Sequence, residues 1–387
     1  MPRRDSRLPV KRCSYCGKDN DDRVSACSNC GTDLQSKPSV ASATFSDYLR
    51  TPLGFIIATA AGLLLALLLL FLILSSLAGT EHEEQALFKR RKDKAEKGDA
   101  AAERELGYMY FYGDGVDKNL PEAVKWYVRA AEQGDVIAES RLGYIYYNGY
   151  GVTTNWPEAT RWWRKAAESG NTEAEYNLAV CLQNGDGTPS NPGEAFRWLR
   201  KAAEHGKPSA QEALGFMYVH GQGGETNEAL AIKWYRKAAE NGLPGAQRNL
   251  GDGYAQGRGG LPQDYAQASK WYRKAADQGD PVAQNKLAIC YVYGQGVPKD
   301  LAAAAKWFEN SAEQGDVVGE YNLGLCYKKG YGLPIDEVQA YKWLQLAAAQ
   351  GDTNARNSEA ALESQMTKEQ IAEALNLAKD FKPLRLR

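Results

Sequence analysis

The sequence predicts an all-α solenoid in which about seven two-helix units stack one on the next. Seven of the nine Trp residues recur at steps of 36 or 37 positions. A leucine column keeps the same step 20 or 21 residues before each Trp, and a glycine column follows each Trp by eight. A repeat of this period is typical of stacked helical units. The three columns are Trp126, Trp162, Trp198, Trp234, Trp271, Trp307 and Trp343; Leu106, Leu142, Leu178, Leu214, Leu250, Leu287 and Leu323; and Gly134, Gly170, Gly206, Gly242, Gly279, Gly315 and Gly351.

The first helix of each unit carries apolar residues at helical spacing, as in AERELGYMYFYG. It ends at a glycine pair, Gly113 and Gly115 in the first unit, because glycine adopts the positive φ that reverses the chain. Asp135, Asn171 and Asp280 follow closing glycines, and we expect them to cap the next first helices.

The second helix reads EAVKWYVRAAEQG in the first unit and places Trp126, Ala130 and Ala131 on one face. The small alanines let neighbouring helices approach closely while the indole fills the gap. A single helix pair cannot cover this apolar face, whereas stacked neighbours can. We therefore expect the packing of every unit to depend on the units beside it.

Both ends of the array, residues 99–351, need a cover. Residues 81–98 contain Gly98, which lies 36 residues before Gly134, but no Trp. They predict a polar helix that covers the start of the array. Residues 352–387 predict closing helices, the last of them capped by Thr367 with Gln370 at the capping-box position.

The motif LGYxYxxGxGV, followed by EAxxWYxxAAEQGD, resembles the Sel1-like repeat, a relative of the tetratricopeptide repeat, over about two-thirds of the chain. The resemblance implies a right-handed α-solenoid whose first helices line the concave face. It also implies a role in assembling protein complexes, often at bacterial envelopes. Thr188 and Gly253 depart from the pattern in the third and fifth units.

Tyrosines on the first helices are candidate partner contacts, because aromatic side chains are enriched at protein interfaces. The alternative is that these rings pack between units. The candidates are Tyr108, Tyr144, Tyr147 and Tyr321.

Three cysteines, Cys181, Cys290 and Cys326, lie three residues after their column leucine, where other units have Met109 or Ile145. Equivalent positions in adjacent units are on the order of 10 Å apart, whereas a disulfide needs Cα atoms within about 7 Å. We interpret the three cysteines as part of the apolar core.

Residues 53–77 form an uncharged apolar run of 25 residues. As a helix this run would measure about 37 Å, which is enough to cross a bilayer with tilt. A buried core helix and a cleaved signal peptide fit less well, because the run is long and about 50 residues precede it. The sequence therefore predicts a single transmembrane helix.

Two observations disagree about the orientation of this helix. Basic residues are concentrated after the run, at 89–94, which favours a cytoplasmic C-terminal side. The cysteines before the run, however, are best kept in a reducing compartment. We expect the N-terminus in the cytoplasm and the repeats in the periplasm, at a bacterial inner membrane.

Cys13, Cys16, Cys27 and Cys30 form the pattern C-x2-C-x10-C-x2-C within residues 1–34, before a linker over residues 35–52. Two such pairs offer four thiolates to one tetrahedral Zn²⁺ and leave no position open for water. The pattern resembles a zinc ribbon and predicts a structural zinc, without which so short a segment would hardly fold. A redox pair, an iron–sulfur site and unligated thiols are the alternatives.

The sequence does not predict an enzyme. Its three histidines, His82, His205 and His220, form no H-E-x-x-H motif, and neither G-x-S-x-G nor a phosphate-binding loop is present. We interpret His205 as a surface residue at a helix end. The net charge of −1 gives no reason to expect a nucleic-acid partner.

The function that these patterns favour is that of a membrane-anchored scaffold or adaptor, which binds a protein or peptide on its solenoid surface. Two alternatives remain. One is a transmembrane signalling protein that couples the repeats to the zinc ribbon. The other is a hydrolase of cell-wall or β-lactam substrates, by analogy with a cysteine-rich branch of the family that the chain resembles.

Overall fold

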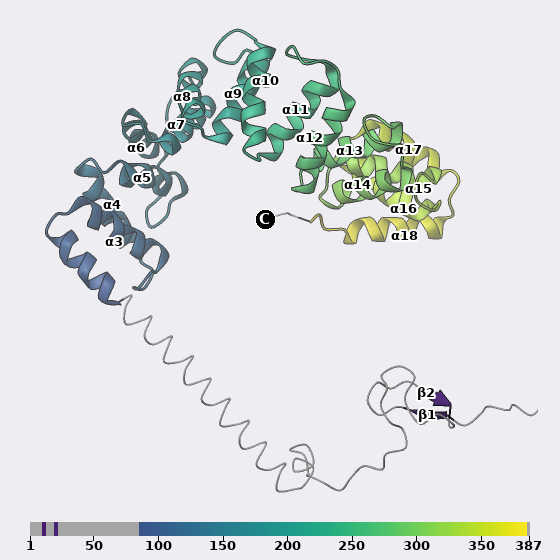
Figure 1. Ribbon diagram of the computed structural model, residues 1–387, viewed down its shortest axis with the longest axis horizontal. Coiled ribbons are helices and arrows are strands. Elements are labelled where there is room, and N and C mark those ends of the chain that lie inside the picture. Colours follow the sequence, from purple (N-terminus) through teal and green to yellow (C-terminus); the bar gives the residue numbers. More distant parts are fainter. Residues whose placement is uncertain (1–9, 13–18, 22–84, 385–387) are drawn as a thin grey trace, which may run out of the picture. The chain divides into compact units, whose positions relative to one another are not determined.

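The computed structural model describes residues 10–12, 19–21 and 85–384 (Figure 1). The chain divides into two compact units, residues 1–82 and 83–387. In the first unit, strands β1 (Val10–Arg12) and β2 (Asp19–Asp21) pair antiparallel, with Val10 opposite Asp21. This hairpin brackets residues 13–18 in the sequence.

Two predictions fall outside the described residues. One is the predicted zinc site of Cys13, Cys16, Cys27 and Cys30, and the other is the predicted transmembrane run, residues 53–77. Within the part of the chain that the structure does describe, no helix is long and apolar enough to span a bilayer.

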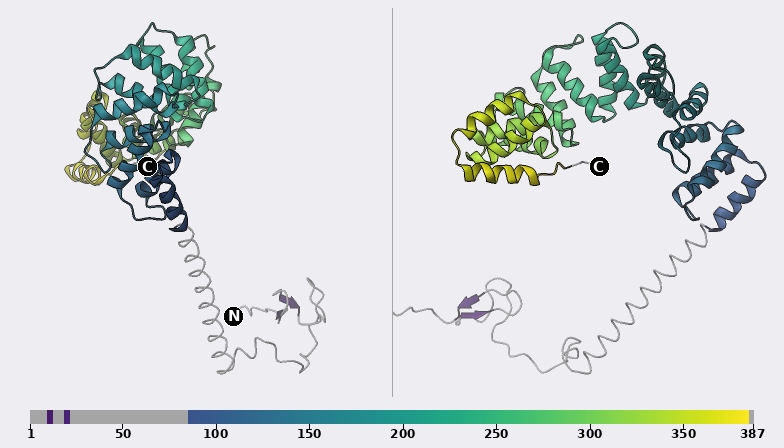
Figure 2. Two further views of the ribbon diagram at one scale, coloured as in Figure 1. Left: turned by 90° about the vertical axis from the view of Figure 1, so that its left-hand side faces the viewer. Right: turned by 180° about the vertical axis from the view of Figure 1, so that it is seen from behind.

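The second unit confirms the predicted all-α solenoid. From α3 to α16, helices of 13 residues alternate as first and second helices of seven repeats, which follow one another along a curved row (Figures 1 and 2). The first helices are α3 (Ala100–Tyr112), α5 (Val136–Asn148), α7 (Thr172–Asn184), α9 (Pro208–His220), α11 (Pro244–Gln256), α13 (Pro281–Tyr293) and α15 (Val317–Lys329). The second helices are α4 (Leu120–Glu132), α6 (Trp156–Glu168), α8 (Pro192–Glu204), α10 (Glu228–Glu240), α12 (Tyr265–Asp277), α14 (Leu301–Glu313) and α16 (Glu337–Ala349).

The predicted helix boundaries are confirmed by their hydrogen bonds. Side-chain oxygens of Asp135, Asn171 and Asp280 each accept from the backbone N–H three residues on, at 2.7–2.9 Å. The glycine that ends each first helix is left-handed, with φ of 80° at Gly113. The local sequence thus sets where each helix starts and where it ends.

The tryptophan column packs between successive repeats. Trp162 of the second repeat lies in one cluster with Ala123 and Tyr127 of the first, and Trp234 of the fourth packs in one cluster with Leu199 of the third. A buried aromatic side chain of this size removes about 150–250 Å² from water. The prediction that each repeat depends on its neighbour for packing is confirmed.

The second glycine of each pair brings adjacent repeats into close contact. Gly151 has φ of 73°, and a Cβ placed there would lie 2.5 Å from the carbonyl carbon of Leu120, the first residue of α4. Gly296 approaches Tyr265 of the preceding repeat in the same way. Both the backbone angle and the lack of space therefore require glycine.

Both ends of the array are covered. Residues 85–96 are helical, and Phe88 packs edge-on against Tyr110, with ring centroids 5.6 Å apart. At the other end, α17 (Thr353–Glu363) and α18 (Lys368–Asp380) pack on α16. The predicted capping box of Thr367 and Gln370 is present.

An extended tail follows α18 and lies on the last second helices. The Phe381 ring meets Trp343 edge-on, with centroids 5.1 Å apart. The Leu384 N–H donates to the carbonyl oxygen of Glu313 at 2.7 Å. The tail therefore covers the last indole of the column from outside the array.

Candidate binding surface

Clefts lie between successive first helices, and three of them occupy the same position of the repeat. Their volumes are about 300 Å³ between α3 and α5, about 220 Å³ between α9 and α11, and about 440 Å³ between α13 and α15. We call this side of the array the first-helix face. The matching lining residues are Tyr108 and Arg141, Phe216 and Asn249, and Ile289 and Asn322.

The first cleft combines tyrosine rings with arginines. Tyr108 and the Tyr127 ring line it together with Arg104, whose Nη1 lies 2.7 Å from Oδ2 of Asp135. Because Asp135 also caps α5, this ion pair joins α3 to the start of the next first helix. Burial raises the pKa of Tyr127, so that hydroxyl keeps its proton.

Gly253 lines the second cleft and stands where other repeats carry a larger side chain. A Cβ on Gly253 would lie 2.5 Å from Cδ1 of Ile232, which lines the cleft. Phe216 and His220 stack at its rim, with ring centroids 3.9 Å apart. At position 253, Ile232 of the preceding repeat occupies the space that a larger side chain would take.

The third cleft is the largest of the three and is mainly apolar. Ile289, Val292 and Leu325 line it, and Lys299 and Lys329 are exposed beside them. This arrangement suits an apolar side chain with negative charge nearby.

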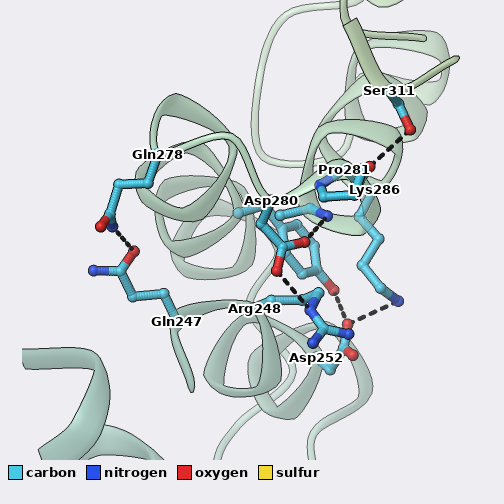
Figure 3. A network of polar contacts seen from close by, with 10 residues as sticks. Gln247, Arg248, Asp252, Gln278, Asp280, Pro281, Lys286 and Ser311 are labelled. Atoms are coloured by element: carbon cyan, nitrogen blue, oxygen red, sulfur yellow. Dashed lines mark hydrogen bonds and ion pairs between the residues drawn. The ribbon is translucent and has the colours of Figure 1, made fainter. Parts of the chain in front are cut away.

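Polar contacts between the second and third clefts fix the fifth repeat to the sixth (Figure 3). Nε of Arg248 in α11 lies 3.3 Å from Oδ2 of Asp280, the cap of α13. Oδ1 of Asp252 accepts from the Tyr272 hydroxyl at 2.6 Å and lies 3.0 Å from Nζ of Lys286. These contacts fix the position of α11 relative to α13. Because α11 lines the second cleft and α13 lines the third, the contacts also stabilise the shape of both clefts.

The four predicted contact tyrosines divide into two pairs. Tyr108 and Tyr144 are exposed, at 45% and 42%. Tyr147 is half-buried beside two indoles, and its hydroxyl donates to Oδ2 of Asp186 at 3.2 Å. Tyr321 is half-buried against the core of α16 and α17. The contact role of all four stays a prediction, and the first pair is better placed for it.

The predicted core role of the cysteines is confirmed. Cys181, Cys290 and Cys326 are buried and unpaired with one another. Burial raises the pKa of each thiol to about 11, so these side chains stay neutral at physiological pH.

The burial of one column of polar residues was not predicted from the sequence, although Glu or Gln recurs three positions before each column leucine. Most of these side chains meet the end of the second helix. Gln133 Nε2 donates to Glu103 Oε2 at 2.6 Å, and Lys165 Nζ lies 2.7 Å from Glu139 Oε1. The column therefore links the two helices of a repeat through polar contacts. Its members are Glu103, Glu139, Glu175, Gln211, Gln247, Gln284 and Glu320.

Two members of this column, Glu175 and Glu320, contact polar side chains at the C-terminal end of the second helix. His205 lies at an exposed helix end as predicted, but its Nδ1 is also 2.8 Å from Oε2 of the buried Glu175. Glu320 accepts from Nε2 of Gln350 at 2.8 Å, and burial raises its pKa to about 7. A carboxyl group of this kind changes charge near physiological pH.

Comparison with known families identifies the repeats. The Sel1 repeat model matches residues 100–135, 136–171, 172–207, 208–243, 244–280, 281–316 and 317–352, well over half of the chain. The chain belongs to the Sel1 repeat family. Proteins with Sel1 repeats generally mediate protein–protein interactions, and their solenoid is typically a non-catalytic scaffold.

Two solved Sel1-type structures are similar to this chain. A Sel1 repeat protein from Oxalobacter formigenes is 34% identical, with a TM-score of 0.60, over 71% of this chain and 79% of that one. The antigen c5321 of uropathogenic Escherichia coli, described as having an SLR fold, is 29% identical, with a TM-score of 0.55, over 77% and 72%. No curated protein matches the chain.

A zinc-ribbon domain model matches residues 9–34, ahead of the Sel1 repeats. This stretch contains all four predicted zinc ligands, Cys13, Cys16, Cys27 and Cys30. Over residues 10–12, 19–21 and 85–384, no group of three or more His, Cys, Asp or Glu side chains could hold a metal ion.

Proposed function

We propose that this Sel1 repeat protein is a membrane-anchored scaffold that binds a protein partner along its first-helix face. The row of clefts between successive first helices carries the proposal, because recesses lined by apolar and aromatic side chains are where partner side chains anchor. Phe216 and Tyr293, beside the second and third clefts, are exposed at 43% and 70%. Aromatic side chains are enriched at protein interfaces.

The anchor in this proposal is the apolar run 53–77, with the N-terminus in the cytoplasm and the repeats in the periplasm. The length of the run and the absence of charge in it support the anchor. The cysteine pairs support the orientation, because thiols persist in a reducing compartment.

The N-terminal module in this proposal holds one structural zinc on Cys13, Cys16, Cys27 and Cys30. Four thiol donors fit the tetrahedral preference of Zn²⁺, and β1 ends directly before Cys13. When bound, the zinc would tie the two cysteine pairs together, which stabilises a segment too short for its own core.

Zinc content tests this module. The purified full chain should contain about one zinc per chain, since one Zn²⁺ takes four ligands. A variant with both Cys13→Ser and Cys30→Ser should contain none, whereas Cys326→Ser should keep its zinc, because that thiol is buried in the repeats. Elemental analysis after desalting gives the measurement. Full zinc in the double variant would refute the site.

Photo-crosslinking in living bacteria tests the scaffold. A benzoylphenylalanine at Phe216 or Tyr293 should form adducts with a partner, because both side chains stand free on the first-helix face. The same group at Lys233, an exposed position on the second helix α10, should form few. The adducts should sediment with membranes, and protease added to spheroplasts should digest the repeats.

The controls separate the parts of the proposal. Deleting residues 53–77 should release the chain from the membrane fraction. Adducts that are equally frequent at Lys233 and Phe216 would argue against a dedicated face. Repeats that resist protease until the membrane is broken would reverse the orientation.

A further inference from the structure

The start of the array carries a continuous group of exposed aromatic rings on its first-helix face. Tyr108 and Tyr112 of α3 have ring centroids 4.5 Å apart, and Tyr144 of α5 lies 5.6 Å from Tyr150 in the next loop. Phe111 joins the two pairs, since its ring is 5.7 Å from that of Tyr150. We call these five residues the aromatic cluster. The four tyrosines are all exposed, which is unusual for rings without a function in binding.

Arg141 stands in the middle of this cluster. It lines the first cleft with Tyr108 and Tyr127, and a smaller hollow with Tyr112 and Tyr144. Its side chain is exposed, and among residues 85–384 no carboxylate forms an ion pair with it.

The other two arginines of the cleft differ from Arg141 in this respect. Nε of Arg91 lies 2.6 Å from Oε2 of Glu105, and Arg104 is paired with Asp135. Asp114 also lines the cleft and forms no ion pair with Arg141. Within residues 85–384, two charged side chains of this lining are therefore in no ion pair, the Asp114 carboxylate and the Arg141 guanidinium, and Arg141 is the cation that stays open to an anion.

An anion beside an apolar group would complement this arrangement. A guanidinium binds a carboxylate with two parallel hydrogen bonds, and the surrounding tyrosine hydroxyls are further donors. Ile137, which is exposed, and the Tyr108 ring give the same cleft an apolar wall. The volume of about 300 Å³ is at the small end for ligand sites, which suits one large side chain rather than a separate molecule.

We propose that the α3–α5 cleft recognises a partner-protein segment in which Asp or Glu stands next to an aromatic or large aliphatic residue. The carboxylate binds Arg141, and the apolar side chain enters the cleft between Tyr108 and Ile137. This assignment rests on the proposed scaffold function and specifies which side chains of the partner protein are recognised.

Peptide selection tests the proposal on the full chain in detergent micelles. Random 12-residue peptides displayed on phage should enrich for Asp or Glu adjacent to Phe, Tyr, Trp or Leu. The most enriched sequence, synthesised with both ends blocked and a fluorescent label, then serves as the probe in anisotropy titrations. Arg141→Ala should weaken binding of the probe at least tenfold. Arg141→Lys should weaken it less, since lysine keeps the positive charge but cannot form two parallel hydrogen bonds to a carboxylate.

The matched control is Arg197→Ala, which removes an exposed arginine from the second helix α8 and should leave binding unchanged. A probe whose acidic residue is replaced by its amide should bind the wild-type chain as weakly as Arg141→Ala binds the original. On the Arg141→Ala chain, replacing the acidic residue of the probe by its amide should cause no further loss of affinity. The comparison of the two probes on the wild-type chain needs no assumption about the fold of the variant, because it changes only the peptide.

Several outcomes would overturn the proposal. They are enrichment of peptides without an acidic residue, enrichment of segments of this chain itself, and binding to Arg141→Ala within twofold of wild type. Crosslinks at Phe216 or Tyr293 in that case would leave the scaffold function standing. Absence of both peptides and crosslinks would refute the two proposals together.

Discussion

Replacing Gly296 by alanine should lower the free energy of unfolding by about 3 kcal/mol. A left-handed backbone costs an L-residue about 1–2 kcal/mol, and overlap with fixed neighbours costs about 1–3 more. Gly296 has φ of 73°, and an added Cβ would overlap the carbonyl of Tyr265 in the preceding repeat. The neighbour is backbone at the start of a helix, so it has little freedom to move. Urea denaturation followed by helical circular dichroism gives the measurement.

Gly242→Ala is the matched control for this substitution. Gly242 has φ of 89°, but a Cβ there would meet no atom within 4 Å. Gly242→Ala should therefore lower the free energy of unfolding only by the cost of the left-handed backbone, about 1 kcal/mol. Equal losses in the two variants would mean that the contact between the loop and the preceding helix contributes nothing to stability.

Glu320→Gln should stabilise the protein at pH 8, by an amount on the order of 2 kcal/mol. Burial raises the pKa of Glu320 from 4.5 to about 7, so the folded state favours the neutral carboxyl. The stability from this group is fully present below pH 4.5 and is lost as the pH rises through 7. Glutamine has no charge to lose, and Gln284 already occupies the same column in the preceding repeat.

The measurement is the free energy of unfolding of both proteins from pH 5 to pH 8. The gap between wild type and Glu320→Gln should widen as the pH rises. Glu139→Gln, the same change in the same column, should instead destabilise by about 1–2 kcal/mol, because it removes the charge that faces Lys165 at 2.7 Å. A gap that does not change with pH would show that Glu320 ionises without penalty.

The fold could be predicted because its determinants repeat. Trp162 and Leu142 recur in register, and one unit alone leaves the indole exposed, so stacking follows from the pattern. The same register placed Cys290 in the core before any contact was known. The position three residues after each column leucine is buried in every repeat, and this is why a cysteine there can be interpreted as part of the core.

The binding surface could be predicted only in part. Tyr144 and Tyr147 lie on one helix three residues apart, yet Tyr144 is exposed, whereas Tyr147 packs beside two indoles of α6 in its own repeat and bonds to Asp186 of the next. The space beside Gly253 is filled by Ile232 of the preceding repeat, and this contact could not be predicted from the sequence. The buried column with Glu139 was missed because glutamate is usually exposed, and its burial depends on partners from the other helix.

The tail over Trp343 limits how the array could have grown. Asp352 caps α17 as Asp316 caps α15, so the chain begins an eighth unit and then covers the outer side of the last indole with Phe381. A module appended at that end would have to displace the tail. One inserted between two interior modules would meet the surfaces that every module already offers. Duplication or loss of a repeat in the middle of the gene can therefore change the number of clefts one at a time, while the segments that cover the two ends of the array stay in place.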